Sequence, residues 1–353
     1  MQKLNSAGMA GFYFLRGTDE ERDKLAGFLQ DDLVKEVTPA GKVPDALHPG
    51  PYLPEIEIAI QDRMFDTKGQ LYYPVEPTNP ELHPFWSPEF FGDVITVNGK
   101  SWPYLSVAPR KYRFHLLNGS NARFYNIWLK NLASGTNGPA IVQVGTDGGL
   151  LDTPVAFNPA LGQKLLLGNG ERADVIVDFS KMAPGTVLTM MNDANAPFPD
   201  GDPVATGTTD RIMQFVVNGK MYDHGSPAKA GKDLSRIPAR LREKALVALT
   251  DFAGKLKVTP DVTRQLTLNE VQGPGGPEMV LVNNSRYEGM PDMPGMFGTV
   301  TEKPVEGTTE KWQIINLTMD AHPMHMHLVQ FQLVSRQKFD EMSEMKEVGK
   351  MSS

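Results

Sequence analysis

The chain of 353 residues contains no cysteine. Its own residues can therefore form neither a disulfide bond nor a zinc or copper site that depends on a thiolate. The sequence also lacks any run of about 18 apolar residues, the length that a membrane-spanning helix needs, so no membrane span is predicted. The N-terminal stretch, MQKLNSAGMAGFYFLRG, has a short apolar patch and no clear cleavage site. No signal peptide is predicted from it, and the compartment stays open.

An excess of positive charge is absent too. The 35 lysine and arginine residues stand against 42 aspartate and glutamate residues, which gives a net charge of −7. Proteins that bind nucleic acid usually carry a basic block or an arginine stripe, and this sequence has neither, so no nucleic-acid partner is expected. The length predicts two or more domains.

Short alternating runs separated by turn residues dominate the sequence, which holds 33 glycines and 28 prolines. Such runs predict β-strands, and Asn98-Gly99 predicts a tight turn. Strands are predicted for the runs Glu55–Asp62, Asp93–Lys100, Arg110–Ser120, Thr263–Val271, Met279–Asn284, Lys311–Thr318 and Leu328–Ser335. The stretches IVQVGTDGG, ADVIVDF and RIMQFVVNG continue the pattern. This succession predicts an all-β chain built as β-sandwiches or barrels.

The alternation stops between residues 220 and 260, where lysine, alanine and arginine become more frequent. We interpret this region as an interdomain linker, within which RIPARLREKALVAL (236–249) is compatible with a short helix. The C-terminal stretch KFDEMSEMKEVGKMSS has no periodicity and is predicted to be a loop or a frayed tail.

Three of the seven histidines, His322, His325 and His327, lie in the stretch AHPMHMHLVQF. Alternate residues of a strand face the same side, roughly 6.5–7 Å apart, so His325 and His327 are predicted to hold one metal ion or two adjacent ones. Pro323 stiffens the entry to this strand and leaves His322 free to face another side. Neutral imidazole binds copper, zinc, iron and nickel alike, so the residues themselves do not select the metal. Ordinary solvated or hydrogen-bonded side chains are expected for the remaining histidines, His48, His83, His115 and His224.

HPMHMH matches the His-Pro-x-His-x-His motif of multicopper oxidases. The stretch FFGDVITVNGKSWPYLSVAPRKYRFHLLNGSNARFYNIWL closely resembles the middle domain of bacterial spore-coat laccases and bilirubin oxidases. The stretches GTDGGLL, ERADVIVDF, RIMQFVV, LVNNSRYEG and EGTTEKWQIINLT extend the likeness in order, from about Lys3 to Gly349. The resemblance implies cupredoxin-like Greek-key β-sandwiches, one complete and one truncated. It places the tail of domain 1 at 1–17, domain 2 at 18–235, the linker at 236–260 and a partial domain 3 at 261–353.

The resemblance also implies copper as the cofactor and a small aromatic reductant together with O₂ as the substrates. Family members oxidise phenols, aromatic amines or bilirubin and reduce O₂ to water, and they are often exported or located in the spore coat. Carried over onto this sequence, the motif makes His322 a ligand of the type 1 copper. His325 then faces the type 2 copper and His327 one of the type 3 pair.

This sequence departs from the family's pattern because it holds one of the four copper motifs and no cysteine for the type 1 site. Three interpretations follow: a truncated laccase-type oxidase, one part of a split oxidase completed by a partner chain, or a non-enzymatic cupredoxin-like protein that binds copper weakly or not at all. A loop with Met290, Met293 and Met296 is a further candidate for binding Cu(I), and otherwise a flexible apolar loop.

Overall fold

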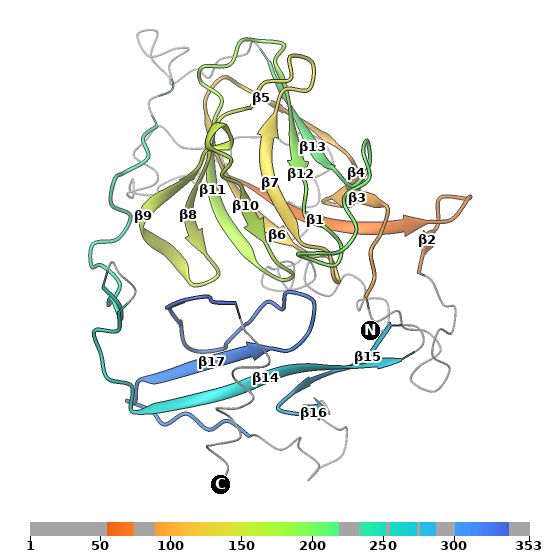
Figure 1. The fold of residues 1–353 in the computed structure, drawn as a ribbon. Helices are drawn as coiled ribbons and strands as arrows, with labels where there is room; N and C mark the ends of the chain where they lie inside the picture. Colours follow the sequence, from red (N-terminus) through yellow and green to blue (C-terminus); the bar gives the residue numbers. More distant parts are fainter. Residues whose placement is uncertain are drawn as a thin grey trace, which may run out of the picture. The chain divides into compact units, whose positions relative to one another are not determined.

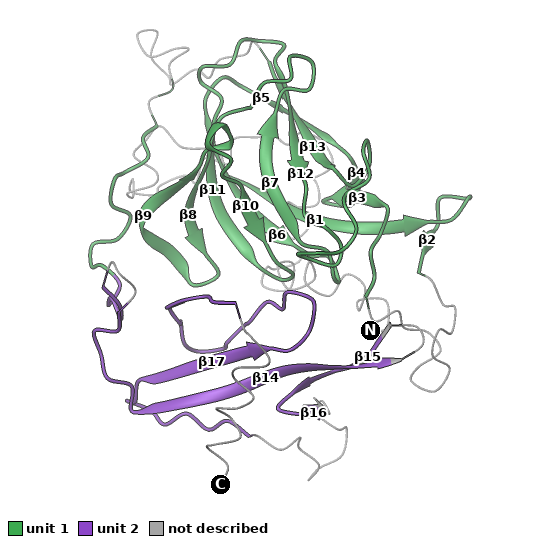
Figure 2. Cartoon of the chain, in the orientation of Figure 1, with its two compact units in different colours: residues 1–74, 89–245 green, residues 75–88, 246–353 purple. Residues whose placement is uncertain are grey.

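The computed structural model describes residues 55–73, 89–218, 233, 235–251, 255–273, 276–286 and 301–338. Within these ranges the regular structure is β-strand, apart from one 3₁₀ turn at Pro159–Leu161, which confirms the all-β prediction. No helix in the described part of the chain is long and apolar enough to cross a membrane. Figure 2 shows the two compact units of the chain. Unit 1 comprises Met1–Pro74 and Glu89–Ala245, and unit 2 comprises Val75–Pro88 and Leu246–Ser353.

The described part of unit 1 forms two sheets (Figure 1). The larger has the strand order β4-β3-β1-β6-β11-β8-β9, with β2 paired to β1. Its strands are β1 (Glu55–Phe65), β2 (Leu71–Tyr72), β3 (Val94–Val97), β4 (Lys100–Ser101), β6 (Lys111–Asn118), β8 (Ile141–Thr146), β9 (Gly149–Phe157) and β11 (Arg172–Asp178). The smaller has the order β10-β7-β12-β13-β5. Its strands are β5 (Tyr104–Val107), β7 (Tyr125–Lys130), β10 (Leu165–Leu167), β12 (Val187–Asn192) and β13 (Arg211–Val217).

The core of unit 1 lies between these two sheets, because one cluster of buried apolar side chains draws members from both. In β1 the residues Ile56, Ile58 and Ile60 are buried at alternate positions, as the sequence pattern predicts. The predicted turn is confirmed as well, since Asn98 and Gly99 have φ angles of 50° and 79° between β3 and β4. A two-layer β-sandwich is therefore the architecture of unit 1.

The segment after residue 235 is not helical, so the short helix with which Arg236–Leu249 is compatible does not form. Instead Ile237 and Leu241 pack with Val144 and Ile176 in a second apolar cluster. The Leu241 amide donates to the Asp152 carbonyl at 2.9 Å, a bond that takes the place of a helical one. Apolar packing against the larger sheet and the backbone bond to Asp152 thus outweigh the helix propensity of this stretch.

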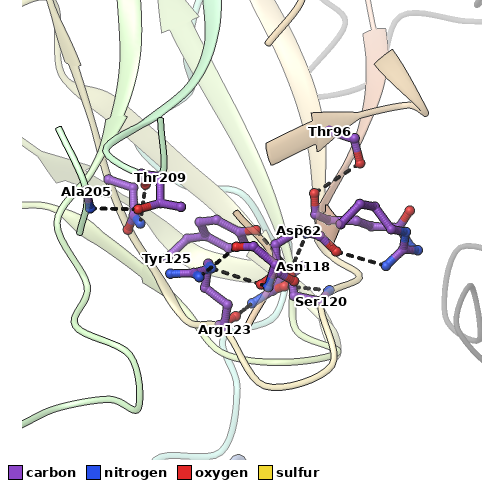
Figure 3. Close-up of polar contacts among 12 residues, drawn as sticks. Asp62, Thr96, Asn118, Ser120, Arg123, Tyr125, Ala205 and Thr209 are labelled. Atoms are coloured by element: carbon purple, nitrogen blue, oxygen red, sulfur yellow. Dashed lines mark hydrogen bonds and ion pairs between the residues drawn. The ribbon is translucent and has the colours of Figure 1, made fainter. Parts of the chain in front are cut away.

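A buried polar cluster joins β1 to two loops of unit 1 (Figure 3). Asp62 is fully buried, and its Oδ2 accepts hydrogen bonds from Arg123 Nε at 2.9 Å and from the Gly92 amide at 2.7 Å. Arg123 Nη2 donates to the Gly92 carbonyl at 2.9 Å. On the other side, the Asp62 amide donates to Ser120 Oγ, which shares a hydrogen bond with the Tyr125 hydroxyl. The cluster fixes the ends of β1 and β6 against the loop before β3.

Unit 2 contains one described sheet with the strand order β16-β15-β14-β17. Its strands are β14 (Val262–Gly273), β15 (Gly276–Val282), β16 (Ser285–Arg286) and β17 (Glu310–Asn316). The strands predicted at Thr263–Val271, Met279–Asn284 and Lys311–Thr318 are confirmed within one to three residues at each end. Among the described apolar side chains of unit 2, only Leu266 and Leu268 are buried, both on β14.

Candidate metal-binding segment

The three candidate histidines lie in the segment that follows β17. Residues 317–338 belong to none of the three sheets, so the strand predicted at Leu328–Ser335 is wrong. The prediction that His325 and His327 share a face of a strand is wrong for the same reason. A strand needs a neighbouring strand to take up its backbone hydrogen bonds, and no described strand pairs with Leu328–Ser335.

His322 is tied to the sheet of unit 2 through its side chain. Its Nε2 shares a hydrogen bond of 2.6 Å with Thr318 Oγ1 and lies 3.7 Å from Glu270 Oε1 on β14. Burial raises the pKa of the Glu270 carboxyl above its ordinary value, and the nearby charge of Asp320 acts in the same direction, against the opposing effect of His322. Thr318 is in turn held by Asn316 Oδ1 at 2.8 Å. The His322 ring therefore has two partners that fix its direction.

His325 and His327 lie next to each other and face solvent. Their ring centroids are 4.9 Å apart, with the ring planes 84° to one another. The Val329 amide donates to the His327 carbonyl at 2.9 Å, and Leu328 between them has a φ angle of 68°. This is a tight three-residue turn with its central residue in the left-handed region. The turn ends the histidine segment directly after His327.

The donor set fits copper only in part. Two adjacent exposed imidazoles suit a copper ion, and solvent can supply the remaining ligands. The described residues include no group of three or more histidine, cysteine, aspartate or glutamate side chains placed to hold one metal ion. A blue copper site does not fit these residues, because it requires a thiolate and the chain has no cysteine. His322 stands apart from the pair through its contacts with Thr318 and Glu270.

The prediction that His115 is an ordinary hydrogen-bonded histidine is confirmed. Its Nε2 lies 3.4 Å from Glu55 Oε2, and its Nδ1 lies 3.8 Å from Asp174 Oδ1. Burial lowers the pKa of His115, but the hydrogen bond to Glu55 and the charge of Asp174 outweigh it and leave the pKa above its ordinary value. The other predictions for single side chains fall outside the described residues: His48, His83, His224, Met290, Met293 and Met296.

Sequence reasoning missed the two partners of His322. Thr318 stands four residues before it, where a hydroxyl could have been suspected of contacting the ring. Glu270 is far away in the sequence and reaches His322 only because β14 and β17 pair in parallel. No local pattern contains that information.

Comparison with known proteins shows similarity to multicopper oxidases. Residues 272–351 match the family model described as multicopper oxidase. The laccase of Bacillus subtilis is 36% identical over 349 residues, covering 98% of this chain and 55% of the laccase. The multicopper oxidase LPR1 of Arabidopsis thaliana is 37% identical over 280 residues, covering 79% of this chain and 42% of that protein. The chain thus spans about half the length of the curated relatives it matches.

The fold agrees with these sequence matches. The crystal structure of McoA multicopper oxidase from the hyperthermophile Aquifex aeolicus superimposes with a TM-score of 0.55 at 28% identity, covering 78% of this chain and 51% of that one. A variant of the same enzyme gives a TM-score of 0.57 at 26% identity. The cupredoxin-like fold predicted from the resemblance is confirmed, and the chain is similar to multicopper oxidases in both sequence and fold.

Proposed function

We propose that this chain functions in a laccase-type oxidase, which oxidises phenols, aromatic amines or bilirubin and reduces O₂ to water. The observation that carries the proposal is the segment HPMHMH, with His325 and His327 side by side and His322 held separately. Similarity to multicopper oxidases supports it, and the name of the Bacillus subtilis relative, laccase, supports the reaction class. Copper supplies the one-electron chemistry that such a reaction requires.

The segment has two parts with different surroundings. His325 and His327 are the proposed ligands of the copper centre that reduces O₂, and both are exposed. His322 is the proposed ligand of the copper that accepts electrons from the reductant. Glu270 and Thr318 hold its ring, as partners of a metal-binding histidine commonly do. The first and the last proposed ligand, His322 and His327, are five positions apart along the chain, which places the two proposed centres close together.

We further propose that a partner chain supplies the thiolate and the remaining imidazoles. The chain has no cysteine, and the described residues offer two adjacent imidazoles where an oxidase needs more. The same observations favour a second candidate function, a non-enzymatic copper-binding protein of the cupredoxin fold.

The 353-residue chain mixed with Cu(II) is expected to stay free of the intense visible band of blue copper proteins. That band arises from charge transfer between a thiolate and copper, and this chain provides no thiolate. Absorption spectroscopy during a Cu(II) titration checks this expectation.

The same absorption spectrum, recorded on complexes purified from cells that express the chain naturally, distinguishes the two candidate functions. A blue complex supports the partner chain, and a colourless one supports the non-enzymatic alternative. An intense band from the isolated chain would contradict both.

Replacing His325 and His327 by alanine together is expected to abolish copper binding, which in the unchanged chain reaches at most about one ion at this site. His325 and His327 each supply one imidazole nitrogen to the proposed site, so the double variant removes both protein donors. Equilibrium dialysis with metal analysis measures the stoichiometry. His115→Ala is the matched control, because it removes a histidine of unit 1 that already contacts Glu55. Unchanged binding in the double variant would move the site elsewhere, first of all to the loop with Met290, Met293 and Met296.

A further inference from the structure

The stretch Val329–Leu333 exposes an apolar stripe outside every described sheet. Val329, Phe331 and Leu333 retain 61%, 56% and 63% of their surface exposed. These residues alternate with Gln330 and Gln332, which is the period of a strand with one apolar face. A stretch with strand character that belongs to no sheet is a template for pairing with another strand.

The order of the side chains indicates that the partner strand is the same stretch of a second copy of this chain. From Leu328 to Val334 the sequence reads LVQFQLV, which is nearly the same in both directions about Phe331. If two copies of the stretch pair antiparallel around that residue, glutamine opposes glutamine and Val329 opposes Leu333. The Phe331 side chains of the two copies oppose each other. Apolar and aromatic cross-strand pairs of this kind stabilise a ladder.

Charge permits the same pairing. Residues 328–335 contain no charged side chain, although the chain as a whole has a net charge of −7. The next cations, Arg336 and Lys338, would oppose Met326 and Met324 of the second copy. No like charges meet across the axis, so the pairing brings no direct repulsion.

We propose that Val329–Leu333 is a docking strand for a second copy of this chain, paired antiparallel about a two-fold axis at Phe331. Opposing residues of an antiparallel pair point to the same face, so the apolar stripes of both copies gather on one side of the ribbon. The tight turn at Leu328 sets where the paired stretch begins. Gln332 anchors the stretch through its side chain, which accepts a hydrogen bond from the Leu249 amide at 3.0 Å and donates one to the Val247 carbonyl.

The dimer is independent of the proposed oxidase function. His327 lies four residues from the axis, so the two copies of it are about 26 Å apart along the ribbon. The pairing therefore adds no ligand to the other copy's histidines. It is tested without copper, so that its failure and a failure of copper binding are separate results.

The test is the molar mass of the full chain in a metal-free buffer containing EDTA, measured by light scattering after size exclusion. The unchanged chain is expected to have about twice the monomer mass of 38.9 kDa. Phe331→Lys sets two lysines against each other on the axis and is expected to give a monomer. Val280→Lys, at a site 57% exposed on β15, is the matched control and keeps the dimer.

A pair of double variants tests the register. Val329→Lys with Leu333→Glu places opposite charges across both symmetric contacts and is expected to dimerise. Val329→Lys with Leu333→Lys places like charges there and is expected to be monomeric, a twofold difference in mass. A monomeric unchanged chain overturns the proposal. So does a dimer that survives Phe331→Lys, and so does equal behaviour of the two double variants.

Discussion

Replacing Arg123 by methionine is expected to destabilise unit 1 by about 3–5 kcal/mol, because it leaves the Asp62 carboxylate buried without its cation. Asp62 is fully buried and Arg123 is 5% exposed, so water cannot replace the lost charge without opening the structure. The hydrogen bonds that the Arg123 side chain donates to Asp62 and to the Gly92 carbonyl disappear together. The loss is therefore larger than that of an ordinary surface contact.

Denaturant unfolding followed by circular dichroism measures this change in the free energy of unfolding. The matched control is Arg172→Met, which breaks the pair with Asp147 at 3.0 Å, where both side chains are about one third exposed. Pairs of that kind contribute about 0–1 kcal/mol. A double variant, Asp62→Leu with Arg123→Met, is expected to recover part of the loss because no lone buried charge remains. Equal losses at Arg123 and Arg172 would show that the buried pair stabilises no more than the exposed one.

This pair also shows where sequence reasoning stops. Asp62 continues the buried alternation of Ile56, Ile58 and Ile60, and a carboxylate at such a position indicates that a partner exists. The partner, Arg123, lies 61 residues further on and reaches Asp62 through a loop after β6. The alternation of apolar residues and the turn residues predict strands and some turns. They do not predict which loops contact which strands in the folded chain.

For the histidine segment, too, part of the prediction rests on residue types alone and part depends on the fold. The residue types predict a metal and the motif predicts copper, and neither depends on the backbone conformation. The strand predicted for Leu328–Ser335 failed because its pattern describes a strand with a neighbour, and the described sheet of unit 2 ends at β17. The short helix compatible with 236–249 does not form because Ile237 and Leu241 pack against Val144 and Ile176 of the sandwich, which local propensity cannot anticipate.

The two units differ in how much apolar surface they bury. Unit 1 encloses one cluster of buried side chains between its two sheets. The described part of unit 2 buries Leu266 and Leu268, while many of its apolar side chains are exposed. Those exposed by more than half are Val247, Val280, Val305, Met319, Leu328, Val329, Phe331 and Leu333. Since burial of apolar surface is the main stabilising contribution, unit 2 is expected to open at a much lower free energy than unit 1.

Limited proteolysis with chymotrypsin, read by mass spectrometry, is therefore expected to cut unit 2 at least about tenfold faster than unit 1. The exposed Phe331 and Leu333 are the first sites expected within the described residues. The resistant fragment should extend past Leu241, because this side chain is 4% exposed and its amide is bonded to Asp152. Its C-terminal end is expected between that residue and the start of β14.

The digestion is run at a chain concentration below that at which the proposed dimer forms, so that the docking strand stays accessible. A fragment ending near residue 235 would mean that the packing of Ile237 and Leu241 is too weak to protect the segment. Equal resistance of both units in a monomer would show that unit 2 closes a core of its own.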